Sequence, residues 1–190
     1  VVEMLYFKRL VIDVILFLVF VGLCVWPILV FVAVASKWLI IGRYKPGAYP
    51  LWGSYYMRWW LVSRLQAFSG LGIFGGTPLA PLIWRLMGAK VGRHCLLQCS
   101  PPAAWDLVSI GDDSSIGFDT QLPGIRIEDG YLLVGSVSIG KRCFVGCHSY
   151  LGLNVTLEDD AKLDDQSLLP DEETIPAGES YRGAPGERGT

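Results

Sequence analysis

The sequence predicts a mainly β fold, a parallel β-helix preceded by one transmembrane helix and short interfacial helices. The first observation behind this prediction is a period of six, at which eight consecutive positions are apolar: Ile139, Val145, Leu151, Leu157, Leu163, Leu169, Ile175 and Tyr181. Helices repeat near 3.6 residues and flat strands near 2, whereas a triangular β-helix turns one residue of each six-residue side inward. The second is an uncharged run of 22 residues, Val14 to Ala35, long enough to cross a ~30 Å hydrocarbon core.

The residues around the apolar positions support the same register. Glycine follows the apolar residue at Gly140, Gly146 and Gly152, where we expect the chain to bend sharply at a corner and a side chain to clash. Small residues recur four positions after the apolar ones, where little room is left: Cys143, Ser149, Val155, Ala161 and Ser167. This pattern resembles the hexapeptide-repeat family of left-handed β-helix proteins, most of which are acyltransferases and a few carbonic anhydrases. The resemblance implies a left-handed β-helix.

The six-residue repeat begins at Val91 and is interrupted twice. The first excursion is CSPPA, about residues 99 to 103, and the second is PGIRIEDGYL, about 123 to 132, whose Glu-Asp-Gly predicts a hairpin turn. Excursions of this kind commonly carry binding residues, because a regular prism has few concave places. We therefore take Arg126, Glu128 and Asp129 as candidate substrate-binding residues.

Composition and turn signals divide the chain into four parts. These are a transmembrane helix segment (1–41), an interfacial loop and helices (42–88), the left-handed β-helix domain (89–182) and an irregular tail (183–190). Residues 55–68 contain no helix breaker and are expected to form an interfacial helix anchored by Trp59 and Trp60, with a soluble core helix as the alternative. A short second helix is expected from the Thr77-Pro78 pair to about Met87.

Charge is distributed unevenly along the chain. Residues 1–98 carry ten Lys and Arg against two acidic residues, and residues 99–190 carry six against sixteen. The basic half would face anionic lipid. The repeat half has no basic stripe, so nucleic acid is not expected as a partner. Two basic residues precede the apolar run and five follow it, which predicts an integral membrane protein with the β-helix on the cytoplasmic side. Because the sequence opens with Val1, we expect it to be part of a longer chain.

Three runs carry a narrower resemblance: KWLIIGRYKPGAYPLWGSYYMRWWLVSRL, GGTPLAPLIWRLMGAKVGRH and IPAGESYRGAP. They resemble, over residues 37 to about 186, the carboxy-terminal region of non-ribosomal-peptide-synthetase-like membrane proteins of the ε-poly-lysine synthetase type. In those proteins an adenylation domain and a carrier domain precede membrane helices that alternate with tandem hexapeptide-repeat domains, to which the joining of aminoacyl groups is attributed. The resemblance implies as partners membrane lipid, upstream adenylation and carrier domains, and sister β-helix domains packed as a trimer or pseudo-trimer.

No cofactor is expected within this segment, because no phosphate-cradling glycine loop occurs in it. The acyl donor implied by the resemblance is a carrier-bound phosphopantetheine thioester or an acyl-CoA. Acyl transfer to an amine also needs a base for the amine proton and donors for the developing oxyanion.

Hexapeptide-repeat acyltransferases usually supply the base as one histidine at a cleft between neighbouring prisms. His148, in VGCHSY, is the candidate base, and nearby Asn154 is a candidate substrate-binding residue. His94, in VGRHCL, holds the same repeat slot near the first coil and is a second candidate. Counting sides places the two histidines on different faces, so they are not expected to share a site. A solvated surface histidine is the alternative for each.

The spacing of the cysteines is one that metal ligands also use. Cys95 and Cys99, like Cys143 and Cys147, are separated by three residues, and a histidine adjoins each pair. Zinc ligands use such spacings, but Cys95 and Cys143 fall in the inward small-residue slot, where cysteine is a compact apolar filler. We therefore expect no metal site. Two histidines also fall short of the three that carbonic anhydrase chemistry usually requires, and five cysteines in a cytoplasmic setting imply free thiols.

Two classes of function remain. The first is a membrane-anchored acyl or aminoacyl transferase module that joins carrier-bound aminoacyl groups to an amine acceptor, with His148 as the base. The second is a non-catalytic β-helix that packs with sister β-helices, which is favoured by the lack of histidine in residues 123–138. The acidic residues between 158 and 173 suit either a solvated ridge or the attraction of a cationic, lysine-like amine.

Overall fold

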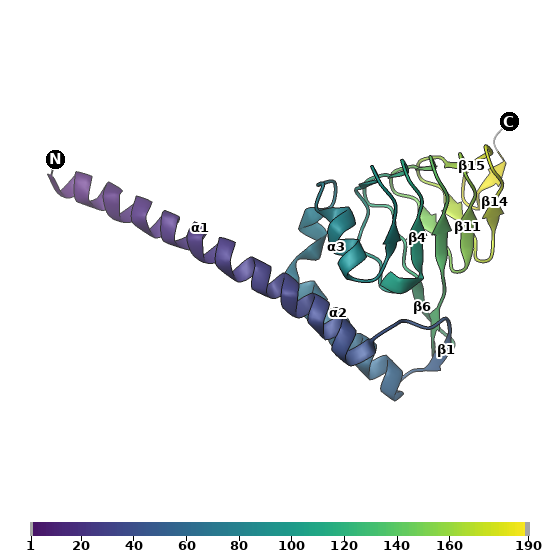
Figure 1. Ribbon diagram of the computed structural model, residues 1–190, viewed down its shortest axis with the longest axis horizontal. Helices are drawn as coiled ribbons and strands as arrows, with labels where there is room; N and C mark the ends of the chain where they lie inside the picture. The colour runs from purple at the N-terminus through teal and green to yellow at the C-terminus, as the bar shows by residue number, and fades with distance from the viewer. Residues whose placement is uncertain (1, 189–190) are drawn as a thin grey trace.

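The computed structural model describes residues 2–188, with side chains from residue 8 onward. A long helix, α1 (Val2–Ser36), runs away from a stack of short strands and continues into one π-helical segment, η1 (Lys37–Ile41). Figure 1 shows α1 projecting from the stack, with the shorter helices at its junction. The segment Lys8–Ile41 is long and apolar enough to cross a membrane, by length and composition. The helix extends well before the predicted start at Val14, because charged residues end an apolar run without breaking a helix.

The strands form a parallel β-helix with three faces. Face 1 contains β2 (Lys90–Val91), β4 (Val108–Ile110), β8 (Val137–Ile139), β11 (Val155–Leu157) and β14 (Thr174–Ile175). Face 2 contains β3 (Leu96–Leu97), β5 (Ser115–Ile116), β9 (Phe144–Val145), β12 (Lys162–Leu163) and β15 (Ser180–Arg182). Face 3 contains β10 (Tyr150–Leu151) and β13 (Leu168–Leu169), with a single bridge from Gln121 to Tyr150. Val137 pairs with Val155 and Phe144 with Lys162, so one coil takes 18 residues.

The predicted register of the core is confirmed. Seven of the eight period-six residues are at most 3% exposed, and the inward residues of the earlier coils continue the same column: Ile110, Ile116 and Leu122. Each such side chain contributes roughly 1.5–3 kcal/mol by leaving water. Tyr181, in the last strand of face 2 that belongs to a coil, is the one of the eight that stays partly exposed.

The corners bend at a different position from the one predicted. The expectation that the bend lies at Gly140, Gly146 and Gly152 is wrong in position, since positive φ angles occur two residues later, as at Arg142 (53°) and His148 (53°). The expectation that a side chain would clash at these glycines is confirmed. A Cβ on Gly146 would lie 2.4 Å from the backbone nitrogen of Asp165 in the next coil, and the other two would meet the same kind of contact. Close stacking of coils therefore explains the glycines.

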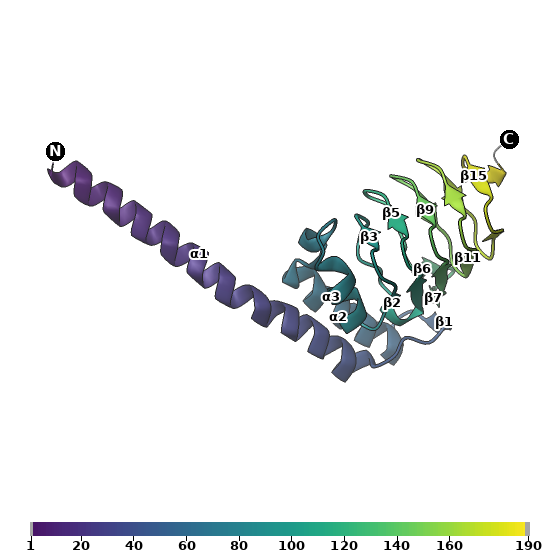
Figure 2. The same cartoon turned by 45° about the horizontal axis from the view of Figure 1, so that its top comes forward.

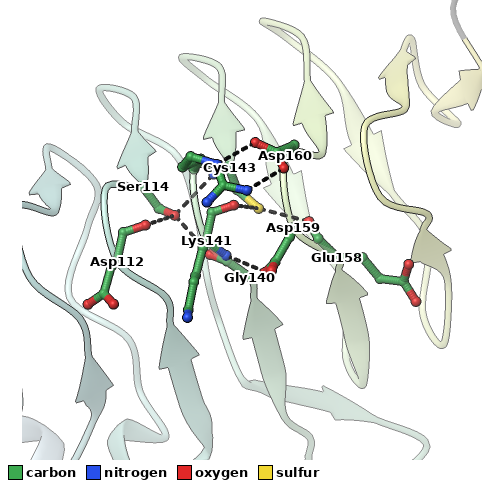
Figure 3. A network of polar contacts seen from close by, with 9 residues as sticks. Asp112, Ser114, Gly140, Lys141, Cys143, Glu158, Asp159 and Asp160 are labelled. Atoms are coloured by element: carbon green, nitrogen blue, oxygen red, sulfur yellow. Dashed lines mark hydrogen bonds and ion pairs between the residues drawn. The ribbon is translucent and has the colours of Figure 1, made fainter.

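Polar side chains join each coil to the next (Figure 3). In the small-residue slot, Ser114 Oγ donates to the carbonyl of Gly140 at 2.8 Å. One carboxylate per corner accepts a backbone N–H of the preceding coil, and three such pairs span 2.6–2.8 Å: Asp159 with Lys141, Asp165 with Cys147, and Asp171 with Leu153. Part of the acidic ridge therefore satisfies backbone donors that bending leaves unpaired.

The second excursion is a β-hairpin, as its turn sequence predicts. It consists of β6 (Ile125–Glu128) and β7 (Tyr131–Val134), joined through Asp129 and Gly130, both at positive φ. Its third strand was not foreseen: β1 (Gly47–Pro50), from the segment predicted as an interfacial loop, pairs antiparallel with β7. The connection after α1 is thus hydrogen-bonded to the β-helix.

Three short helices lie between α1 and the first coil, and Figure 2 shows two of them there. They are α2 (Ser54–Ser69), η2 (Leu71–Phe74) and α3 (Ala80–Leu86), and a further short helix, η3 (Trp105–Leu107), follows the first excursion. Trp84 of α3 packs edge-on against Trp105, which closes the end of the β-helix. The expectation that Trp59 is an interfacial anchor is wrong, because Trp59 packs toward the core, whereas Trp60 is exposed.

The tail also differs from the prediction of an irregular segment. β16 (Glu187–Arg188) turns back and pairs antiparallel with β15, with Tyr181 opposite Arg188. A short strand pair of this kind depends on the strand that is already present, so the residues of the tail alone do not predict it.

Candidate functional site

His148 lies at the corner between faces 2 and 3, in the positive-φ slot described above. Its Nδ1 is 3.3 Å from Asp119 Oδ2, and the ring of Phe118 meets the imidazole edge-on at a centroid distance of 6.0 Å. About half of the side chain is exposed. The Asp119 carboxylate lies beside Nδ1, which leaves Nε2 as the other ring nitrogen. An exposed imidazole with a carboxylate neighbour is a candidate base.

His94 lies at a different corner, between faces 1 and 2. Its Nδ1 is 3.2 Å from Asp113 Oδ1, and the column continues with Arg142 donating to Asp160 at 2.7 and 2.6 Å. Basic and acidic side chains therefore alternate from coil to coil at this corner. The structure does not bring His94 and His148 together, which agrees with the count of sides.

The two histidines share a backbone position that has a structural explanation. Nine corner residues other than glycine adopt positive φ in this slot: His94, Asp113, Asp119, Arg142, His148, Asn154, Asp160, Gln166 and Glu172. Asn, Asp and His are the side chains most often found in that conformation. Position alone therefore does not distinguish a catalytic histidine, and a carboxylate neighbour does not either, since His94 has Asp113 and His148 has Asp119. Among the described residues, the ring of Phe118 is the feature that His148 has and His94 lacks.

Arg126 is the centre of a second group. Its Nη1 and Nη2 donate to the two oxygens of Asp171 at 3.1 and 2.5 Å, and Nη2 lies 3.0 Å from Glu128 Oε2. The hydrogen bond to Asp171 raises the pKa of the guanidinium further. Partial burial acts to raise the pKa of Asp171, but the bonds from Arg126 and from the Leu153 N–H outweigh it and leave that pKa below its ordinary value.

A hollow of about 280 Å³ adjoins this ion pair. Arg126, Asn154, Asp171 and Glu172 line it. The structure therefore brings the predicted Arg126 and Asn154 together, with Glu128 held against Arg126, while Asp129 stays in the exposed hairpin turn. Sequence reasoning placed Asp171 in a solvated ridge, and the 45 residues between it and Arg126 gave no signal of their pairing.

A groove between α2 and the two excursions was missed entirely. Two hollows of about 380 and 360 Å³ both include Trp59, Pro101 and Ala103 in their linings. Three buried nitrogens of their lining residues have no hydrogen-bond partner among the described residues: Trp59 Nε1, Gln66 Nε2 and Arg126 Nε. Trp105 Nε1 donates to Gln66 Oε1 at 3.2 Å, which orients that amide. Unpaired N–H groups favour a ligand that offers acceptor oxygens.

The cysteines behave as packing residues. Cys143 Sγ donates to the carbonyl of Glu158 at 3.0 Å and Cys95 Sγ to that of Gly111 at 3.1 Å, in the inward slot. Burial raises the pKa of Cys99 to about 12. Within residues 8–188, no group of three or more His, Cys, Asp or Glu side chains is arranged to hold a metal ion.

The fold and the repeats define the class of this protein, a left-handed parallel β-helix built from hexapeptide repeats. Residues 136–164 match the family described as hexapeptide repeat of succinyl-transferase. Two solved structures share the fold: a maltose O-acetyltransferase from Clostridium difficile 630 (TM-score 0.54, 13% identity, 75% of this chain and 91% of that one) and a galactoside acetyltransferase in complex with coenzyme A (TM-score 0.51, 17% identity, 67% and 79%). At these identities the likeness is one of fold.

The more specific relative is a synthetase. This chain is 28% identical over 156 residues to delta-poly-L-ornithine synthetase of Acinetobacter baumannii (strain AB307-0294). The match covers 82% of this chain but only 12% of that protein's length. The resemblance to poly-amino-acid synthetases, expected from the aromatic and glycine-rich runs, is confirmed.

Proposed function

We propose that this chain is an acyl or aminoacyl transferase module of a poly-amino-acid-synthetase-like membrane protein, which joins carrier-bound aminoacyl groups to an amine. The observation that carries the proposal is the 28% identity to a poly-ornithine synthetase over 82% of the chain, on a fold shared with acetyltransferases. The name of that relative implies amide bonds between amino-acid units. Forming such a bond from a thioester is an acyl transfer to nitrogen.

His148 is the proposed base. The amine nitrogen attacks the thioester carbonyl, a C–N bond forms, the C–S bond breaks, and the sulfur leaves as a thiolate. The proton released by the amine passes to His148 Nε2, while Asp119, 3.3 Å from Nδ1, holds the ring in position. The donor is a carrier-bound phosphopantetheine thioester or an acyl-CoA, supplied by upstream adenylation and carrier domains in the first case.

Sister β-helices are the proposed partners of face 2, arranged as a trimer or pseudo-trimer. Leu96 and Phe144 project from face 2 with large exposed surfaces, and Phe118 is exposed beside His148. Exposed apolar groups of this size gather at protein interfaces. A neighbouring prism over face 2 would exclude water from the His148 corner and complete the site.

The proposed location is the membrane, with α1 as the anchor and the β-helix on the cytoplasmic side. The support is the apolar span Lys8–Ile41 and the excess of Lys and Arg that follows it. The basic amino-terminal half then lies near anionic lipid, and the acidic β-helix stands away from it.

The test is His148→Ala in the full-length protein, assayed for polymer formation. We expect His148→Ala to lower turnover about 10²–10⁴-fold, which is the usual contribution of a general base. Asp119→Asn should lower turnover less. His94→Ala is the matched control and should keep normal turnover. Unchanged turnover in His148→Ala removes the base assignment.

A second function is favoured by one observation. The slot of His148 is also filled by Arg142, Asn154 and Gln166, none of which is a base at neutral pH, and the hairpin offers no histidine. In this alternative the β-helix is a scaffold for active sister domains. Normal turnover in His148→Ala together with lost turnover in Phe144→Lys, which places a charge on face 2, identifies the scaffold.

A further inference from the structure

The apolar surface of α1 is longer than a bilayer requires. From Val14 to Ile41 the chain has 28 residues, about 42 Å at 1.5 Å per residue, and its one charged side chain, Lys37, is fully buried, whereas the hydrocarbon core is about 30 Å thick. Exposed apolar side chains continue to Leu39, which is 85% exposed. A span that exceeds the core tilts. Tilting brings the carboxy-terminal part of α1, and the elements packed beside it, down to the membrane surface.

Those elements are α2, η2 and α3. Trp26 Nε1 donates to the carbonyl of Ser69 at the end of α2 (3.0 Å), and the Trp26 ring stacks on Phe74 of η2 at 4.6 Å. Further along α1, Trp38 Nε1 donates to the carbonyl of Leu86 in α3 at 2.9 Å. The two views in Figures 1 and 2 agree that α2 lies alongside α1 over this stretch. Lipid at this level of α1 therefore also reaches α2.

The side of α2 that faces away from the β-helix is apolar and basic. Its exposed residues follow helical spacing and are defined here as the outer face of α2: Met57, Arg58, Trp60, Leu61, Arg64 and Phe68. Phe68 is 80% exposed, and Ile73, just beyond the end of α2, is 69% exposed. A helix that faces water carries polar residues there instead. Residues 54–69 contain no acidic side chain.

We infer that the outer face of α2, together with Ile73, rests in the interfacial layer of an anionic membrane leaflet as a second lipid contact beside α1. Trp60 and Phe68 enter the acyl boundary, and Arg58 and Arg64 meet lipid phosphates. This inference rests on the membrane anchoring proposed above. It adds a surface that fixes the tilt of the β-helix against the bilayer and keeps its first coil close to the headgroups.

Photo-crosslinking in the full chain tests the inference. p-Benzoylphenylalanine replaces one exposed phenylalanine at a time, the protein is reconstituted in vesicles of 70% phosphatidylcholine and 30% phosphatidylglycerol, and adducts are identified by mass spectrometry. We expect lipid adducts at Phe17 of α1 and at Phe68, and none at Phe118 on the β-helix, whose exposure is similar to that of Phe17.

The possible results separate the inference from its premise. Adducts at Phe17 but not at Phe68, or protein adducts at Phe68 in place of lipid, overturn the second contact and leave the anchor intact. Absence of lipid at both positions overturns the anchoring itself. Neither result bears on the transfer chemistry, which the His148→Ala assay reports.

The preference for anionic lipid has its own readout. We expect phosphatidylglycerol to be enriched at least about threefold over its bulk share among Phe68 adducts, and the enrichment to vanish in Arg58→Gln/Arg64→Gln. The matched control is Arg182→Gln on the last coil, which should retain it. If the Phe68 adducts of the chain that keeps both arginines contain the two lipids in their bulk ratio, the anionic preference is overturned.

Discussion

Lys37, at the end of the long apolar helix, lies 2.7 Å from Asp106, which follows the first excursion of the β-helix. The lysine side chain is fully buried, and its Nζ lies 3.5 Å from the centroid of the Trp38 ring. The other oxygen of Asp106 accepts the backbone N–H of Tyr44 at 2.9 Å. One carboxylate thus holds the helix, the connection that follows it and the first coil together.

Replacing Lys37 by methionine should destabilise the chain by on the order of 3 kcal/mol. The apolar stem is kept, but Asp106 is left as a largely buried charge with one partner fewer. Adding Asp106→Asn should restore part of the loss, because asparagine is neutral and still accepts the Tyr44 N–H. Denaturant unfolding in detergent, followed by tryptophan fluorescence, gives the free energy of unfolding of both variants. A double variant less stable than the single one would contradict the buried-charge explanation.

Gly146→Ala should be strongly destabilising, by about 2–3 kcal/mol or more. The added Cβ would meet backbone atoms of Asp164 and Asp165 at 2.4–2.6 Å, and a backbone cannot move aside as a side chain can. Gly72→Ala is the matched control, since its Cβ would meet only Pro101 at 4.0 Å. Thermal unfolding of the two variants should separate them clearly. Equal melting temperatures would refute close coil stacking as the reason for the repeat glycines.

The ion pair of Arg126 and Asp171 should give a pH-dependent contribution to stability. The pKa of Asp171 is lowered in the folded state, so its contribution is present above the unfolded value of about 3.9 and is lost as pH falls through the lower folded value. Asp171→Asn should therefore lower the urea midpoint at pH 7 and have progressively less effect below pH 4. Asp129→Asn, in the exposed turn, should leave the midpoint unchanged at both pH values.

The cysteines should differ widely in reactivity. With the pKa of Cys99 raised to about 12 by burial, only about one thiol in ten thousand is ionised there at pH 8, and the thiolate is the reactive form. Cys147, at a partly exposed corner, should react with iodoacetamide at least about a hundredfold faster. Peptide mass spectrometry over time measures both rates, and similar rates would show that the first excursion opens readily.

The period of six predicts the core because it is a local property of the chain. Every sixth side chain meets the same inward environment, so Leu151 and Leu163 could be placed without knowing any long-range contact. The hairpin was likewise predictable from its own turn residues. The clash at the glycines was also expected, but not its source, since the atoms that forbid a side chain at Gly146 belong to residues 18 or more positions away.

The contacts that fix the candidate sites are long-range, and the sequence gives little sign of them. β1 pairs with a hairpin more than 80 residues later, and Arg126 meets Asp171 at a sequence separation of 45 residues. Each of these residues also has an ordinary local explanation as a loop or a solvated charge. His148 could be singled out by residue type, but its neighbour Asp119 is 29 residues earlier and lies in the preceding coil only because the hairpin lengthens that coil.

The reversal of the chain from β15 into β16 limits how the stack can grow. A parallel β-helix ends in open strand edges that could accept the next coil of the same chain or an extended segment of another molecule. By running antiparallel, Glu187–Arg188 takes the hydrogen-bonding edge of β15 that a further parallel coil would need. A parallel strand from another molecule therefore cannot pair directly with β15.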